Sequence, residues 1–272
     1  MNTIRLPAVA GMFYPSDVYE LEDEVTNLLE YTRSDFRPDK IFGLISPHAG
    51  YIYSGKTAAR AYNLLRNRNY PRVIILSPSH REYFKGVSVF SGEAYKTPIG
   101  EVPVDTEFRK KLLDQKDIVF ESVQGHRNEH AIEVQIPFLQ VTMKNFSIVP
   151  LVIGDQRAGN VYRLAEILNP LIDDGTLIIV STDLSHFHTK AEADQLDSIV
   201  EQRIKTLDYE SLQKEFETRK CEACGGGGII TLLKLAEMKN KNKVKILSRC
   251  DSGDITGDER EVVGYLSAVI YE

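Results

Sequence analysis

This sequence of 272 residues contains few cysteines, few glycines and prolines, and no long hydrophobic segment. Its three cysteines, an odd number, do not suit a disulfide scaffold and favour a reduced, cytoplasmic location. The 18 glycines and 11 prolines are too few for a collagen-like or disordered chain. No apolar run approaches the roughly 20 residues of a membrane-spanning helix. Pro7 and Gly11 interrupt the first apolar stretch, so no signal peptide is expected either.

Positive charge is also in deficit. The 33 basic residues are outnumbered by 39 acidic ones, which gives a formal net charge of −6. Surfaces that bind nucleic acid or anionic lipid carry an excess of lysine and arginine. We therefore expect neither nucleic acid nor a membrane as a partner, and a small molecule or a peptide as the substrate.

What the chain does contain is an alternation of short apolar runs and amphipathic stretches. The runs are short and rich in β-branched residues, which favours strands over helices. Strands are predicted at 41–47, 72–79, 147–154, 176–183 and 243–249, with 262–271 as an added edge strand. Helices are predicted at about 18–32, 55–67, 129–142, 158–173, 190–206 and 226–239. This order predicts a single α/β domain over residues 1–272 with a mostly parallel, covered sheet.

Three of the predicted strands lead into polar clusters that contain histidine. The segments IFGLISPHAG, VIILSPSH and LIIVSTDLSHFH carry, in this order, His48, His80, and Asp183 with His186 and His188. Ligands of parallel α/β sheets gather outside the carboxyl ends of the strands. One such histidine alone is more often a hydrogen-bonded loop residue than a ligand. Several converging imidazoles, however, need a cation or a carboxylate nearby, so the pattern indicates a functional site at this edge.

A second distinctive stretch is the segment KCEACGGGGII. Cys224 precedes four glycines that run into a predicted helix. A thiol beside a helix N-terminus gains thiolate character, and glycines let the backbone approach a ligand closely. A flexible turn explains the same residues equally well. Cys221 and Cys224 also form a Cys-x-x-Cys pair, but the strand–Cys-x-x-Cys–helix order of a thioredoxin fold is missing.

Residues Gly50–Thr57 satisfy the phosphate-loop pattern G-x-x-x-x-G-K-[ST] between a predicted strand and a predicted helix. Against this interpretation, the bulky residues Tyr51, Ile52 and Tyr53 stand where a phosphate cradle must be compact. Nucleotide binding at Gly50–Thr57 therefore stays a minor alternative.

Residues 126–130 match the inverted zinc-peptidase pattern H-x-x-E-H. Gly125 indicates that His126 lies outside the helix, which would spoil the spacing of the two imidazoles. Within the predicted helix 129–142, His130 and Glu133 would share a face, as would Glu129 and Glu133. These residues are expected next to the site.

Taken together, these motifs resemble those of the Memo family, whose archaeal and bacterial members are named for the AmmeMemoRadiSam system. The resemblance runs in order through RLPAVAGMFYP (5–15), PHAGYIYSG (47–55), SPSH (77–80), EHAIEVQIPFL (129–139), STDLSHF (181–187) and CGGGGI (224–229). It implies a three-layer αβα domain similar to class III extradiol dioxygenases, which are non-haem iron enzymes. The name of the system also implies a radical S-adenosylmethionine enzyme and a second small protein as partners.

The resemblance further implies a metal pocket of two histidines and one cysteine. By their motifs, these are His48 of PHAG, His80 of SPSH and Cys224 of the cysteine-glycine segment.

Polar residues of the same pocket correspond to Asp183, His186 and His130, which are the candidate catalytic residues. Glu129 and Tyr51 are expected in the substrate pocket, although core packing is an equally good explanation for Tyr51.

A site of two imidazoles and one thiolate leaves a coordination position open, as catalytic metal sites do. Related dioxygenases hold Fe(II) with two histidines and a carboxylate, whereas sulfur favours copper(I), zinc or redox-active iron and is itself oxidisable. We therefore expect a metal-dependent oxidoreductase that holds iron or copper, with zinc as the alternative metal. An animal member of the family is regarded as a phosphopeptide-binding adaptor, so a binding module without turnover is the alternative function.

Overall fold

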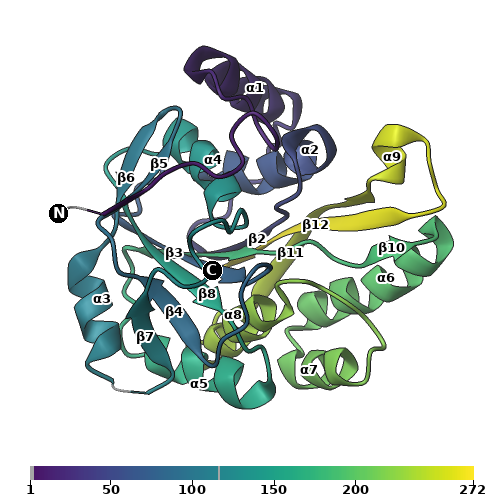
Figure 1. Ribbon diagram of the computed structural model, residues 1–272. Coiled ribbons are helices and arrows are strands. Elements are labelled where there is room, and N and C mark those ends of the chain that lie inside the picture. The colour runs from purple at the N-terminus through teal and green to yellow at the C-terminus, as the bar shows by residue number, and fades with distance from the viewer. Residues whose placement is uncertain (1–2, 116) are drawn as a thin grey trace.

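A nine-stranded sheet forms the middle of the molecule (Figure 1). The computed structural model describes residues 3–115 and 117–272. The four central strands are parallel and lie in the order β2 (Ile41–Ser46), β9 (Thr176–Ser181), β3 (Arg72–Pro78) and β8 (Ser147–Ile153). All four were predicted as strands, and they are buried on both faces, as parallel strands covered by helices must be.

Antiparallel strands extend this centre on both sides. Strand β12 (Val262–Tyr271) pairs with β2, and β11 (Lys243–Asp251) and β10 (His186–His188) pair in turn with β12. On the other side, β4 (Val87–Phe90) is antiparallel to β8, and β7 (Val119–Ser122) follows it. The prediction of an edge strand at 262–271 is therefore wrong: β12 has neighbours on both sides, and almost all of its residues are buried.

Helices cover both faces of the sheet, which confirms the three-layer α/β architecture (Figure 1). One face carries α1 (Val18–Tyr31), α2 (Tyr51–Tyr62) and α4 (Ile136–Thr142), and the other carries α5 (Ala158–Leu168), α6 (Lys190–Thr206), α7 (Tyr209–Glu217) and α8 (Gly226–Met238). Strand β3 shows why both faces of the sheet are covered. Val73 and Ile75 join the core of the first face, and Ile74 and Leu76 join that of the second, because successive side chains of a strand point to opposite sides.

Smaller elements that the sequence patterns did not predict complete the domain. A three-stranded sheet consists of β1 (Ile4–Arg5), β5 (Ala94–Thr97) and β6 (Gly100–Pro103). The short helices α3 (Thr106–Leu113) and α9 (Gly253–Thr256) precede β7 and β12. Two 3-10 turns, η1 (Asn63–Leu65) and η2 (Glu133–Gln135), follow α2 and precede α4. Among the described residues, no helix combines the length and the apolar character needed to cross a bilayer.

Two helix boundaries differ from the predictions in ways that matter for the site. Helix α2 begins at Tyr51 directly after the N-cap Gly50, four residues earlier than predicted. Helix α4 begins only at Ile136, where Pro137 fits the first turn of a helix. Residues Glu129 and His130 therefore lie in the loop before η2, and the predicted helical face that they would share with Glu133 does not exist.

Candidate metal centre

The carboxyl ends of three adjacent parallel strands deliver the polar residues of the site. His48 follows β2, Asp183 follows β9, and His80 follows β3. Cys224 comes from a distant segment, the loop that leads into α8. Parallel neighbours end at the same edge of a sheet, so His48, His80 and Asp183 are brought together there. The loop of Cys224 reaches the same edge, although Cys224 lies 176 residues after His48 in the chain.

The side chains of His48, His80 and Cys224 offer one ligand atom each, and these atoms all lie within 4.8 Å of one another. Cys224 Sγ lies 3.2 Å from His48 Nε2, and the ring centroids of His48 and His80 are 5.0 Å apart. Donors that share an ion at bond lengths of about 2.0–2.3 Å are separated by roughly 3–4 Å. The arrangement therefore fits a single metal ion.

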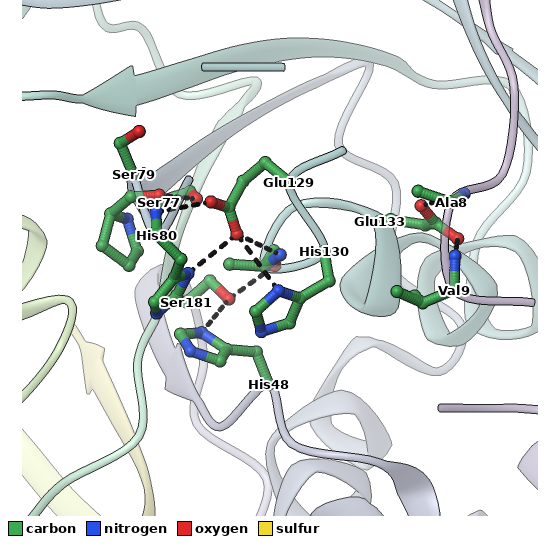
Figure 2. Close-up of polar contacts among 12 residues, drawn as sticks. Ala8, Val9, His48, Ser77, Ser79, His80, Glu129, His130, Glu133 and Ser181 are labelled. Carbon is green, nitrogen blue, oxygen red and sulfur yellow. Dashed lines mark hydrogen bonds and ion pairs between the residues drawn. The ribbon is translucent and has the colours of Figure 1, made fainter. Parts of the chain in front are cut away.

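The tautomer of His48 is fixed by a chain of buried hydrogen bonds (Figure 2). Ser181 Oγ donates its only proton to Ala131 O at 2.6 Å and accepts from Gln135 Nε2 at 2.8 Å. It can therefore only accept from His48 Nδ1, which lies 3.0 Å away. With the proton on Nδ1, the lone pair of His48 is on Nε2, the nitrogen that faces Cys224.

Gln135 is fully buried and holds this chain in place. Its Nε2 also donates to Pro47 O at 2.9 Å, and its Oε1 accepts from Tyr62 at 2.6 Å. The amide thus links the loop of His48 to Ser181 at the end of β9. The sequence reasoning missed both Ser181 and Gln135, because a serine or glutamine within an apolar run carries no signal of its partner.

Glu129 plays the corresponding part for His80. Its Oε1 lies 2.8 Å from His80 Nδ1, and its Oε2 accepts from the His80 backbone N–H at 2.7 Å. A carboxylate on Nδ1 leaves Nε2 free to bind a metal. Glu129 Oε1 also lies 3.3 Å from Nδ1 of His130, whose ring stacks on that of His80 with centroids 4.7 Å apart. Figure 2 shows this carboxylate between the two imidazoles.

The cysteine loop is seated against the end of β9. Cys224 N–H donates to Asp183 O at 3.2 Å, and Asp183 N–H points at Cys224 Sγ at the same distance. A Cβ on Gly225 would lie 2.5 Å from Ser181 O, so only glycine allows this close approach. Asp183 Oδ1 accepts from the backbone N–H of His48 at 2.7 Å, which ties the loops of His48 and Cys224 together.

Burial sets the protonation of these groups. It lowers the pKa of His48 to about 3, helped by the nearby His80, and it lowers the pKa of His130 to about 4, helped by His48. Burial and the nearby Asp183 raise the pKa of the Cys224 thiol well above its usual range. Burial alone would raise the pKa of Glu129, but its hydrogen bond and charge interaction with His80 outweigh this and lower it to about 2. Neutral imidazoles offer lone pairs to a cation. The buried thiol can lose its proton only if a positive charge lies nearby, so the site suits a metal ion.

A cavity of about 640 Å³ opens onto this centre. His48, His80, His130, Asp183 and His186 all line it. The three candidate catalytic residues Asp183, His186 and His130 therefore lie on the same wall as two of the candidate ligands. Cys224 lines a second, smaller cavity together with His186 and Cys221.

Tyr51 does not lie where the substrate pocket was expected. It is 4% exposed, its hydroxyl donates to Val134 O at 2.7 Å, and its ring packs against Tyr14 and Phe138. Tyr51 is the first residue of α2, and its side chain packs into the core. Tyr53, two residues further along the helix, lines the cavity instead.

The remaining motif residues have structural surroundings. His126 is fully buried between Tyr95 and Ser88, and Glu133 binds Arg5, Tyr14 and the backbone N–H groups of Ala8 and Val9 (Figure 2). Both lie away from the metal centre, so H-x-x-E-H does not form a zinc-peptidase site. Cys221 is buried in the core, and burial together with Glu215 raises the pKa of its thiol to about 12.

The phosphate-loop interpretation is also wrong. From Tyr51 onward the segment is helical, so its backbone N–H groups form helix hydrogen bonds and no cradle. Lys56 points to the surface, with Nζ 4.6 Å from the centre of the Tyr31 ring.

The fold and the centre together define an α/β protein with a candidate site of two histidines and one cysteine at the carboxyl edge of its sheet. A sequence model described as "Memo-like protein" matches residues 5–269. The chain belongs to the Memo family.

Curated relatives share the full length of the chain. A "MEMO1 family protein" from Methanobrevibacter smithii is 37% identical over 282 residues, which cover 98% of this chain and 99% of the relative. Another from Sulfolobus acidocaldarius is 37% identical over 281 residues, covering 97% and 98%. A solved structure, that of an uncharacterized protein from Escherichia coli K12, is similar with a TM-score of 0.58 and 17% identity, over 85% of this chain and 100% of that one. At this identity it supports the fold alone.

Proposed function

We propose that the protein is a metal-dependent oxidoreductase that holds iron or copper through His48, His80 and Cys224 and acts on a small molecule in the adjoining cavity. The observation that carries the proposal is the meeting of two oriented imidazoles and one sulfur, with both histidines in the wall of a large cavity. Two nitrogens and a thiolate favour copper(I), zinc or redox-active iron over hard cations such as Mg²⁺. When bound, iron or copper would supply the electron-transfer chemistry that amino-acid side chains lack.

The protein's own residues would then orient the ligands and contact the substrate. Ser181 and Glu129 hold Nδ1 of His48 and His80, so that Nε2 of each ring is available to the ion. His130 is neutral at physiological pH because burial and the nearby His48 lower its pKa to about 4. As a neutral imidazole in the cavity wall, it would accept a hydrogen bond from a substrate hydroxyl or amine.

Elemental analysis after anaerobic purification tests this proposal. We expect about one ion per chain in the wild-type protein, and less than about a tenth of that in His80→Ala and Cys224→Ala, since each removes a ligand. His188→Ala is the matched control, because His188 pairs with Glu222 outside the trio, at 2.8 Å. If the wild-type protein is purified without metal, anaerobic titration with Fe(II), Cu(I) and Zn(II) replaces the first measurement.

Unchanged metal content or affinity in both ligand variants would refute the metal site. If the metal is bound but a loaded protein never consumes oxygen or changes redox state with any small phenol or amine, the oxidoreductase part is wrong.

A further inference from the structure

The wall of the cavity at the metal centre contains several exposed apolar side chains. Four of the nine large hydrophobic side chains that stand exposed among the described residues line it: Met12, Ile52, Tyr53 and Phe187. Met12 and Ile52 are each 72% exposed and Phe187 is 71% exposed. Phe13 and Tyr265 line the same space from more buried positions. Exposed apolar side chains that gather around one cavity mark a ligand-binding surface.

Phe187 is held in this exposed position by its backbone. Its φ of 61° is in the left-handed region, which is rarely adopted by a bulky residue. The neighbouring His186 and His188 both pair with β12, and the register shifts between them. The irregularity leaves Phe187 outside the ladder and its ring in the cavity wall. Backbone strain of this kind is concentrated at binding and catalytic sites.

The charged residues of the cavity are all acidic. Among the described residues that line it, none is lysine or arginine, and three are carboxylates: Asp183, Asp258 and Glu261. Asp183 is 4% exposed and lies at the inner end, beside His48. Asp258 and Glu261 are exposed and lie at the outer end.

The two outer carboxylates differ in their partners. Asp258 is paired with Arg260, whose Nε lies 2.9 Å away. Glu261 forms no ion pair within 4.0 Å among the described residues, and the positive charge near it is that of Arg260, which is bonded to Asp258. A cavity lined by charge of one sign attracts ligands of the opposite sign and repels those of its own.

From the apolar wall and the unpaired carboxylate we infer that this cavity takes an aromatic small molecule that is neutral or cationic, and that it excludes anionic ones. The ring of the ligand would lie against Tyr53 and Phe187, and a positively charged amine would face Glu261. The opposite, polar end would point toward the histidines, which is the only part of the inference that rests on the proposed function. Recognition of a phosphopeptide requires an arginine or lysine that binds the phosphate. None of the described residues that line this cavity is an arginine or a lysine.

Three phenols with the same ring and short arms that end in differently charged groups test this inference: tyramine (cationic), para-ethylphenol (neutral) and phloretate (anionic). Their affinities are measured by isothermal titration calorimetry with the full-length protein, as purified and after removal of metal by a chelator. In the chelated protein the carboxylate of phloretate cannot gain affinity by binding the metal ion, so the comparison of the three phenols reports on the cavity wall alone. We expect tyramine to bind about tenfold more tightly than phloretate near neutral pH, with para-ethylphenol between them.

Glu261→Gln should reduce this charge preference by about two- to fivefold, because it removes the exposed charge but keeps the shape of the side chain. Glu259→Gln is the matched control: it removes a charge from the same loop at a residue that does not line the cavity. Phe187→Ala should weaken all three phenols by a similar factor, since it removes ring contact and no charge.

Tighter binding of phloretate, failure of all three phenols to bind at millimolar concentration, or an equal effect of the two glutamate variants would overturn the inference. These outcomes are separable from failure of the metal site. A chelated protein that still prefers tyramine would support the cavity's ligand class even if His80→Ala left the metal content unchanged.

Discussion

His48 and His126 are both buried, and in each case burial lowers the pKa of the imidazole to about 3. His126 has both ring nitrogens occupied by the protein framework: Nδ1 lies 2.7 Å from the Tyr95 hydroxyl and Nε2 lies 3.2 Å from Ser88 O. Only Nδ1 of His48 is held in this way, by Ser181, and its Nε2 faces the sulfur of Cys224. Burial and pKa therefore do not distinguish a candidate ligand from a structural histidine, whereas the partner of the second nitrogen does.

The surroundings of the two histidines reinforce this difference. The backbone of His126 accepts a hydrogen bond from Arg5, and Arg5 also pairs with the buried Glu133, so this region fastens the N-terminal segment to the domain. The region of His48 instead opens onto a cavity of about 640 Å³. In the region of His126, hydrogen bonds within the protein use both ring nitrogens. In the region of His48, Nε2 stays available to a metal ion.

The largest effect on stability is expected from His126→Ala. The substitution leaves a buried cavity and removes the partners of Tyr95 and Ser88, which should lower the free energy of unfolding by roughly 3 kcal/mol. The metal content of the folded protein should not change. Denaturant titration of chelated protein, together with elemental analysis, measures both quantities. His80→Ala should lower the metal content, and it should change the free energy of unfolding little because the His80 side chain is 27% exposed. Loss of metal in both variants would remove the distinction between the two regions.

Gln135→Leu tests whether the hydrogen-bonded chain behind His48 matters to the metal. Without the amide, Ser181 and Pro47 O each lose a donor, and Ala131 O alone directs the Ser181 proton away from His48 Nδ1. We expect the metal affinity to fall by about 10- to 100-fold, the usual range for residues that orient a ligand. Tyr62→Phe, which removes only the donor to Gln135 Oε1, should have a smaller effect. Competition with a chromophoric chelator measures both variants, and an unchanged affinity in Gln135→Leu would contradict the proposed tautomer control.

Metal binding should release about one proton near neutral pH. His48 is already neutral in the metal-free protein, whereas the Cys224 thiol, with its raised pKa, must give up a proton to become a ligand. Affinity should therefore rise about tenfold per pH unit in this range, because the raised thiol pKa keeps the proton on sulfur until metal displaces it. Calorimetry in buffers of different ionisation enthalpy counts the protons. A pH-independent affinity would show that the sulfur is not a ligand or is already a thiolate.

The smallest effect is expected from Lys56→Ala. Lys56 is an exposed residue of α2, close in sequence to His48, and it contacts the Tyr31 ring. Its removal should change the free energy of unfolding by less than about 0.5 kcal/mol and leave metal binding intact. ATP and GTP should not alter the melting temperature of either protein. A nucleotide-dependent shift that disappears in the variant would restore the phosphate-loop interpretation.

The central parallel strands and the long helices followed from local patterns, whereas β4, β7 and β10 were not predicted. The apolar runs at 72–79 and 176–183 become β3 and β9 because both faces of each strand are buried, which requires apolar residues throughout. Helix α6 has its predicted bounds, and in the structure Thr189 and Glu192 form a capping box at its start. The short strands β5 and β6 were not predicted, because their burial depends on packing against the N-terminal segment.

The site was predictable only in part. His48, His80 and Cys224 carry motif signals, and the structure brings their ligand atoms within 4.8 Å of one another. The orientation of Tyr51 was not predictable, because a four-residue difference in where α2 begins decides whether the ring faces the cavity or the core. Which side chain holds which ring, Ser181 for His48 and Glu129 for His80, also depends on tertiary contacts.

By itself, the sequence determined which segments become buried strands and which polar residues follow them, because hydrophobic periodicity and chain order are local properties. Only the tertiary structure decided that β12 is an interior strand, that Glu129 holds His80 while Ser181 holds His48, and that Glu261 faces the same cavity as Phe187. These relations join residues far apart in the chain, and they exist only once sheet pairing has fixed the distances between them.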